Sequence, residues 1–298
     1  MSRLTSAQRQ RQSAAATFGL LLAAILIGCG IGLFAYPNGR LTCGNYVLNA
    51  YLYILLSLIL ASLVATQLGV LDVDSNTNAD TNADTGVPSA FRALFSSTIG
   101  WMVLFLTTLG ALFLTMWTDP RQTVAKHGAW LLFVGCFGVL LHPIYAYTRR
   151  RGVFARTALT TLAVVLGLTA LAFWRPDWIS LSWGPVLLVM LFAGIIMRIV
   201  MWFTQPPVEY GVEYGDDGED DDNENPHATV VRGRWRQWFK WDELLSWGFV
   251  VLFSLLLLYD TKRLQVHARR CVVPDYINDS VSIFLDVSNL FANLGRIQ

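Results

Sequence analysis

The chain has 298 residues, of which 54% are hydrophobic and 14% charged, and its formal net charge is +1. Its mean hydropathy is clearly positive, at +0.45. This composition excludes an ordinary water-soluble domain and predicts an integral membrane protein.

Apolar runs long enough to cross a bilayer as helices, which takes about 20 residues, recur along the chain. They cover residues 18–36, 48–70, 94–117, 129–147, 157–174, 181–203 and 244–260, and a weaker eighth run covers 280–294. Several tryptophans stand near the ends of these runs, as in the aromatic belts of membrane proteins. We therefore expect an all-α polytopic membrane bundle of seven spans plus a shorter C-terminal helix, similar in class to other helical membrane bundles.

The pattern divides the chain into four parts. A polar tail covers residues 1–16, the first six spans cover 17–203, a polar region covers 204–243, and a C-terminal helix pair covers 244–298. The letters LIGC that end at Cys29 also fit a bacterial lipoprotein cleavage site. Because the apolar run continues through Tyr36, a first membrane span is the favoured interpretation.

Two polar segments interrupt the apolar pattern. The segment 72–86 contains the tandem repeat TNAD-TNAD and is expected to be a mobile loop. It starts like a calcium-binding loop, but Thr77 and Ala83 replace the required Gly and Glu, so a solvated linker is favoured. The segment 204–243 is first acidic, then basic and aromatic. Its last part predicts a helix lying in the lipid interface, and the span that follows favours lipid over nucleic acid as its partner.

Basic residues support a cytoplasmic N-terminus, because the N-terminal tail, the 149–156 loop and the 232–240 stretch then share one side. One basic group conflicts with this orientation. Lys262, Arg263, Arg269 and Arg270 then lie on the opposite side. Either the loop after 244–260 carries its charge on that side for a reason, or an earlier run does not fully cross.

Cys43 and Cys271 lie in the first and last loops, which share one side if every run crosses. A disulfide between them is expected if that side is lumenal or extracellular. The alternative is a zinc site that adds His127 and His267. Paired CxxC motifs are absent from the sequence, so the disulfide ranks first. The sequon at Asn278 points to the same side.

Two aspartates stand in this apolar C-terminal region. Asp260 ends the 244–260 run, and Asp286 lies within the last one. On a helix, Ser282, Asp286, Asn289 and Asn293 follow at steps of four, three and four, so they form one polar stripe. The stripe should face the bundle interior or a water-filled cavity, because an ionisable group in hydrocarbon is costly and is tolerated where it has partners.

Asp260 is the natural candidate to meet Asp286 in that interior. Two carboxylates in a low-dielectric site are expected to hold one shared proton. Protonated, they would bridge the two helices, and deprotonated they would repel each other and attract Ca²⁺ transiently as hard oxygen ligands. The alternative is that Asp260 merely ends its helix near water and that Asp286 bonds to a neighbouring span. His142 is the other ionisable group deep in an apolar run; a hydrogen bond at a kink beside Pro143 is favoured over pH sensing.

The motifs YDTKRL at 259–264 and PDYINDSVSIFLDVSNLF at 274–291 resemble the C-terminal signature of the Bax inhibitor motif family, also called TMBIM or lifeguard proteins. The resemblance is specific over these two motifs and topological elsewhere. It implies a helical bundle in the endoplasmic reticulum, Golgi or another endomembrane that passes Ca²⁺ down its gradient and restrains cell death.

The resemblance also assigns the family's pH-sensing aspartyl pair to Asp260 and Asp286. Some members carry a basic residue on the second helix against this pair, and residues 48–70 contain none. Arg198 is the strongly basic residue well inside an apolar run, and snorkelling to the interface is favoured over a substitute role at the pair.

The function expected is a pH-regulated passive Ca²⁺ leak channel without a cofactor, with the lipid bilayer, Ca²⁺ and cell-death regulatory membrane proteins as partners. The alternatives are a non-conducting regulator that acts through partners and a coupled transporter. No enzymatic activity is expected, because the sequence lacks HExxH, GxSxG and a phosphate-binding glycine loop.

Overall fold

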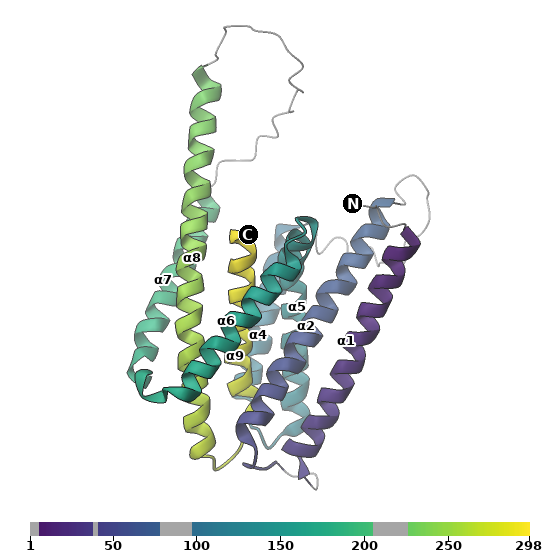
Figure 1. Cartoon of the computed structure of the whole chain (residues 1–298), viewed down its shortest axis with the longest axis vertical. Coiled ribbons are helices and arrows are strands. Elements are labelled where there is room, and N and C mark those ends of the chain that lie inside the picture. The colour runs from purple at the N-terminus through teal and green to yellow at the C-terminus, as the bar shows by residue number, and fades with distance from the viewer. Residues whose placement is uncertain (1–5, 38–40, 78–96, 205–225) are drawn as a thin grey trace.

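The computed structural model describes residues 6–37, 41–77, 97–204 and 226–298, and within these ranges the protein is helical without strands. Consecutive long helices run in opposite directions, and both termini lie at the same end of the bundle (Figure 1). We call this end the termini end and the opposite one the disulfide end. The helices are α1 (Ser6–Ala35), α2 (Tyr46–Thr77), α4 (Thr98–Trp117), α5 (Thr123–Arg150), α6 (Phe154–Trp174), α7 (Gly184–Thr204), α8 (Pro226–Arg269) and α9 (Tyr276–Ile297).

Each predicted apolar run corresponds to one helix. Among the described residues, seven helices from α1 to α8 are long and apolar enough to cross a membrane. The eighth, α9, is the predicted C-terminal helix. The polytopic all-α bundle expected from the sequence is therefore confirmed. The basic residues left open whether one of the earlier apolar runs fails to cross the membrane, and each of these runs forms a helix of sufficient length.

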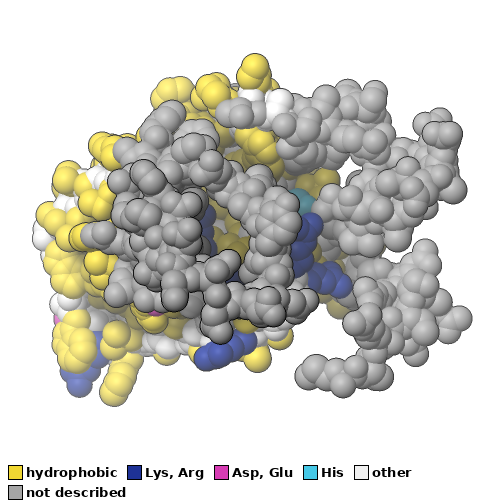
Figure 2. Space-filling view, turned by 90° about the horizontal axis from the view of Figure 1, so that it is seen from above, with side chains coloured by type: hydrophobic (Ala, Val, Ile, Leu, Met, Phe, Trp, Pro, Cys, Tyr) yellow, Lys and Arg dark blue, Asp and Glu magenta, His cyan; other side chains and the backbone are white. Residues whose placement is uncertain are grey.

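The distribution of side chains is that of a membrane protein. Apolar residues face outward on the peripheral helices, for example Leu33 on α1 and Val189 on α7, which are 72% and 68% exposed. In the view onto the termini end, hydrophobic side chains lie along the left and upper outline of the described part (Figure 2). These surfaces suit contact with lipid rather than water.

Helix α9 lies at the centre of this arrangement. It packs against α8 along its length and also against α2, α6, α5 and α4, whereas α1 packs on α2 and α7 packs on α8 at the periphery. Residues on all sides of α9 are buried, including Ile283, Phe284, Leu290 and Leu294. The aspartate within α9 is consequently held in the interior of the protein.

One close approach fixes α2 against α5. A Cβ atom at Gly138 would lie 2.8 Å from the backbone oxygen of Ala61 and 2.9 Å from Cβ of Val64. A side chain larger than hydrogen therefore does not fit there without moving a backbone.

The polar segments behave differently from the sequence expectations. Helix α2 continues to Thr77 and includes the start of the predicted 72–86 loop, whose remaining residues lie outside the described ones. The acidic stretch before residue 226 also lies outside the described residues. The basic aromatic stretch is not a separate interfacial helix, because α8 runs unbroken from Pro226 into the span and extends beyond the bundle (Figure 1). After Pro226, which suits a first helical turn, α8 contains no further proline that would end it.

Candidate functional site

Asp260 and Asp286 come together where α8 and α9 pack side by side. Asp286 is 4% exposed, and the side chain of Asp260 is 11% exposed. The two carboxyl groups interact with each other, and Ser282 lies beside Asp260. The structure thus places the predicted pair, and one member of the predicted stripe, at a single buried site.

The carboxyl group of Asp286 is incompletely satisfied. Its Oδ2 atom is buried and has no hydrogen-bond partner among the described residues. A buried polar atom without a partner is costly, and its cost is greater if the group is charged. A proton shared with Asp260, or a cation, would relieve this cost.

Arg263 provides a positive charge next to the pair that the sequence reading did not assign. Its Nη1 atom lies 3.7 Å from Oδ1 of Asp260, and its Nη2 atom lies 3.9 Å from Oδ1 of Asp279. The guanidinium therefore stands between two carboxylates and is shared by them. Arg263 lies one turn after Asp260 on α8. This contact with the carboxylates explains why one of the basic residues that conflict with the predicted orientation lies at the disulfide end.

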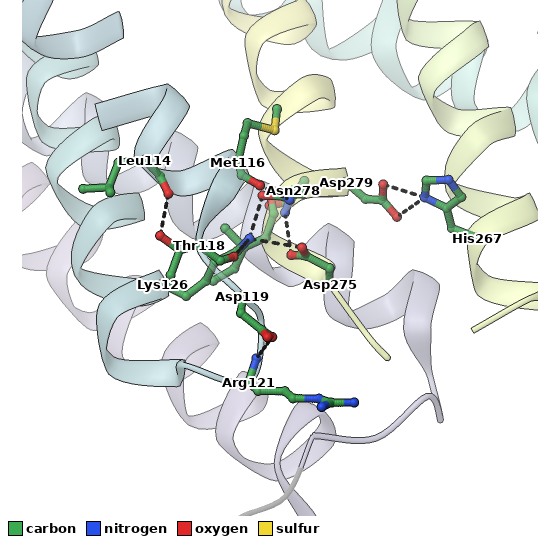
Figure 3. Close-up of polar contacts among 12 residues, drawn as sticks. Leu114, Met116, Thr118, Asp119, Arg121, Lys126, His267, Asp275, Asn278 and Asp279 are labelled. Atoms are coloured by element: carbon green, nitrogen blue, oxygen red, sulfur yellow. Dashed lines mark hydrogen bonds and ion pairs between the residues drawn. The ribbon is translucent and has the colours of Figure 1, made fainter. Parts of the chain in front are cut away.

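Asp279 itself is deeply buried, at 5% exposed. The hydroxyl of Tyr46 donates to its Oδ2 atom at 2.9 Å. The Nδ1 atom of His267 lies 2.9 and 3.0 Å from its two oxygens, as drawn in Figure 3. Asp279 stands three residues before Ser282, so the polar stripe of α9 extends one turn further than the sequence reading placed it.

Lys126 anchors the beginning of α9 and was also not assigned from the sequence. Its side chain is 2% exposed, and its ammonium group donates to the carbonyl of Thr118 at 2.9 Å, to Asp275 at 3.0 Å and to Asn278 at 2.9 Å (Figure 3). These three acceptors use all the hydrogens of the ammonium group. Asp275 is the N-cap of α9 and also accepts from the backbone N–H of Asn278.

Burial raises the pKa of the Asp275 carboxyl, and the neighbouring ammonium of Lys126 acts in the opposite direction.

A cluster of aromatic side chains lies near Asp275 at the disulfide end. The hydroxyl of Tyr53 lies 2.6 Å from Nε2 of His127, whose Nδ1 atom lies 2.7 Å from the carbonyl of Thr123. Tyr36 is the third member, 3.5 Å from the same Nε2 atom.

The two loop cysteines are joined at this end. Cys43 and Cys271 form a disulfide with Cα atoms 5.9 Å apart, which ties the loop after α1 to the loop before α9. His127 is instead bonded to Tyr53, and His267 to Asp279, so the zinc alternative is not the arrangement found. Among the described residues, no group of three or more His, Cys, Asp or Glu side chains could hold a metal ion.

The remaining polar side chains of the stripe bond within and around α9. Ser282 donates to the carbonyl of Asp279, and Asn289 donates to that of Leu285. Asn293 donates to the carbonyl of Asn289 and is 7% exposed. The stripe runs along most of α9 and reaches the termini end at Asn293.

Arg198 is not placed against the aspartyl pair. Its guanidinium donates to Asp242 and, at 3.0 Å each, to Ser246 and Asn293. It does not simply reach towards lipid headgroups either, because these bonds hold it against α8 and α9. Arg198 and Asn293 thus belong to one cluster, separated from Asp260 along the bundle.

His142 lies apart from both clusters. Its Nδ1 atom is 3.0 Å from the carbonyl of Ala65 on α2. The expected hydrogen bond is present, but it joins α5 to α2 instead of serving the carbonyl freed by Pro143.

Comparison with known proteins relates the chain to a family model and to curated proteins. The family model described as inhibitor of apoptosis-promoting Bax1 matches residues 43–214, which is more than half of the chain. This range precedes the two C-terminal motifs and covers α2 to α7. A growth hormone-inducible transmembrane protein of Rattus norvegicus is 27% identical over 215 residues, which cover 68% of this chain and 53% of that protein. The chain therefore spans about half the length of this curated relative. No solved structure matches it.

Proposed function

The chain belongs to the Bax inhibitor family, and from that premise we propose that it is a pH-regulated passive Ca²⁺ leak channel of an endomembrane. The observation that carries the proposal is the pair of buried carboxyl groups, Asp260 and Asp286, on the two helices that pack most closely at the centre of the bundle. Intramembrane carboxylates are functional by default, because their burial is costly.

The pair would act as a latch. With one shared proton, Asp260 and Asp286 bridge α8 and α9 and hold them together. When the proton is lost, the two negative charges repel each other and offer hard oxygen ligands to a divalent cation. The pair and its neighbours supply too few ligands for a resident Ca²⁺ ion, which takes six to eight oxygens, and weak, transient binding is what conduction requires.

The location and biological role belong to the same proposal. The disulfide favours an oxidising compartment on the side of Cys43 and Cys271, as in the lumen of an endomembrane. The family's description supports a role in restraining cell death, and membrane proteins of that process are the proposed partners. The proposal assigns the chain no catalytic step and no cofactor.

The experiment is Ca²⁺ entry into proteoliposomes across a pH series. Wild-type protein is compared with Asp260→Asn and Asp286→Asn, and Asp177→Asn serves as the control because that residue is exposed in the short 3-10 helix Pro176–Trp178 between α6 and α7. We expect a flux whose pH dependence is flattened by both substitutions and unchanged in the control. A correctly folded wild-type protein that passes no Ca²⁺ at any pH refutes the channel, and saturable flux coupled to a proton gradient indicates a transporter instead.

A non-conducting regulator is the second candidate. The extension of α8 beyond the rest of the bundle favours it, because an exposed helix offers a surface to a partner (Figure 1). Partner binding should survive loss of both aspartates and fail when residues 215–243 are replaced by a neutral linker. Pull-down with the two sets of variants separates this function from the channel.

A further inference from the structure

Arg198 reaches across one helix to touch another. It is carried by α7, which packs on α8 at the periphery of the bundle. Its guanidinium passes the α8 residues Asp242 and Ser246 and bonds to Asn293 on α9. The ring of Phe249 lies under it, 5.3 Å from the guanidinium carbon. The charged group therefore occupies the space between α8 and α9.

This position coincides with the end of the polar stripe. From the disulfide end, the stripe leads from Asp279 through Ser282, Asp286 and Asn289 to Asn293. Asn293 is its last member, and Arg198 donates a hydrogen bond to the side-chain oxygen of that residue. Any polar species that follows the stripe towards the termini end consequently meets the guanidinium last.

The charge of Arg198 does not depend on pH, because a guanidinium keeps its proton in proteins. Its counter-ion, Asp242, is 44% exposed, whereas the arginine side chain is 23% exposed. Water therefore weakens the ion pair on one side, and the guanidinium faces the protein interior with its charge only partly compensated. Arg296, a second cation near Arg198, adds to the positive potential at this end.

We propose that Arg198 closes the termini end of the polar stripe and acts as a positive barrier that limits the passage of cations there. This inference deepens the proposed function, because it names the residue that sets the rate and the charge selectivity for a divalent cation between α8 and α9. Arg198 is a specificity residue in this scheme, separate from the aspartyl latch.

The test measures access to the stripe without requiring ion conduction. Asn289→Cys serves as a reporter in a background in which the free cysteines Cys29 and Cys136 are replaced by alanine and the disulfide is kept. Purified protein is treated with a cationic or an anionic methanethiosulfonate reagent, and the labelling rates are compared with and without Arg198→Gln. We expect the cationic reagent to react about tenfold or more faster in the glutamine variant, the lower end of charge-steered rate effects, and the anionic reagent to gain less.

Matched variants separate a barrier from a structural clamp. Arg198→Lys retains the charge and should label slowly, like the wild type. Arg296→Gln removes an exposed positive charge at the same end without touching Asn293, so it should speed cationic labelling less than Arg198→Gln does. Asp242→Asn removes the counter-ion, so the barrier predicts unchanged or slower cationic labelling, whereas a weakened clamp predicts faster labelling with both reagents.

Equal labelling of Asn289→Cys with and without Arg198→Gln would overturn the inference, as would faster labelling in Asp242→Asn. If Arg198→Gln does not elute as a folded species, the lysine and Asp242→Asn comparisons decide. Ca²⁺ flux is then measured on the same proteins and should rise several-fold in Arg198→Gln. A wild-type protein that passes no Ca²⁺ in the flux assay refutes the channel proposal alone, because the labelling rates are measured independently of conduction.

Discussion

Lys126→Met should lower the stability of the folded protein more than most single substitutions. Methionine keeps the length and apolar contacts of the lysine stem but removes the ammonium group. The carboxylate of Asp275 and the amide oxygen of Asn278 then lose a donor that now lies 3.0 and 2.9 Å away, and the carbonyl of Thr118 loses one at 2.9 Å.

The magnitude follows from the burial of the partners. Removing one member of a buried ion pair costs about 3–5 kcal/mol, because the other charge is left without compensation. The side chain of Asp275 is 24% exposed and can regain some water, so we take the low end, about 3 kcal/mol. If the scaling of soluble domains of about 150–250 residues holds, this lowers Tm by roughly 6–12 °C.

The loss should depend on pH, with a sign set by Asp275. Burial raises the pKa of this carboxyl above its ordinary value of 3.8, so at a pH between the unfolded and the folded pKa the folded protein holds a proton that the unfolded chain has released. The stability from this group is complete below the unfolded pKa and is lost as the pH rises through the folded pKa. Without Lys126 the folded pKa rises further, so the destabilisation by Lys126→Met should be small in acid and grow with pH.

Thermal unfolding in detergent, followed by tryptophan fluorescence at a series of pH values, measures these effects. The double variant Lys126→Met with Asp275→Asn provides the control, because it removes the uncompensated charge and should recover part of the lost stability. A Lys126→Met protein as stable as the wild type at neutral pH, or a double variant that recovers nothing, would refute the argument.

Two further substitutions test the packing and the covalent link. Gly138→Ala should destabilise the α2–α5 contact by about 1–3 kcal/mol, because its Cβ has no room against Ala61; Gly135→Ala on the same helix meets nothing within 4 Å and should be neutral or stabilising by thermal unfolding. Replacing Cys43 and Cys271 by serine should lower the free energy of unfolding by about 2–5 kcal/mol. The Tm of this variant should fall to that of the wild type under reducing conditions. The pairing would be contradicted if the non-reduced wild type did not migrate faster on gels than the reduced protein.

The sequence located the helices because bilayer thickness dictates the length of apolar runs. It placed their ends less well. Helices α1, α2 and α8 continue into polar residues, because helical hydrogen bonding needs no lipid. Helix α2 ends at Thr77 and α8 begins at Pro226, both well beyond the apolar part of the helix. Hydrophobicity marks where a helix enters the membrane, whereas caps and prolines determine where the helix ends.

The aspartyl pair could be predicted because both residues interrupt apolar runs and Asp286 belongs to a helical stripe. The cluster at the start of α9 could not, because its partners are distant in the chain: Lys126 bonds to residues 149 and 152 positions away. One signal was available. Asp275 and Asp279 precede Ser282 at the same steps of four and three, so the stripe could have been extended to the start of α9.

The cross-links at the disulfide end determine how the protein is able to move. At that end the chain is held by a covalent bond, by the buried Lys126 and by Asp279. At the termini end α9 is held by the hydrogen bond that Arg198 of α7 donates to Asn293 and by the one that Thr157 of α6 donates to Gln298. Helix α9 therefore begins next to a covalent cross-link, whereas hydrogen bonds and packing hold its C-terminal end. Any rearrangement that separates α9 from α8 should therefore be a tilt about Tyr276, with displacement that grows towards the C-terminus.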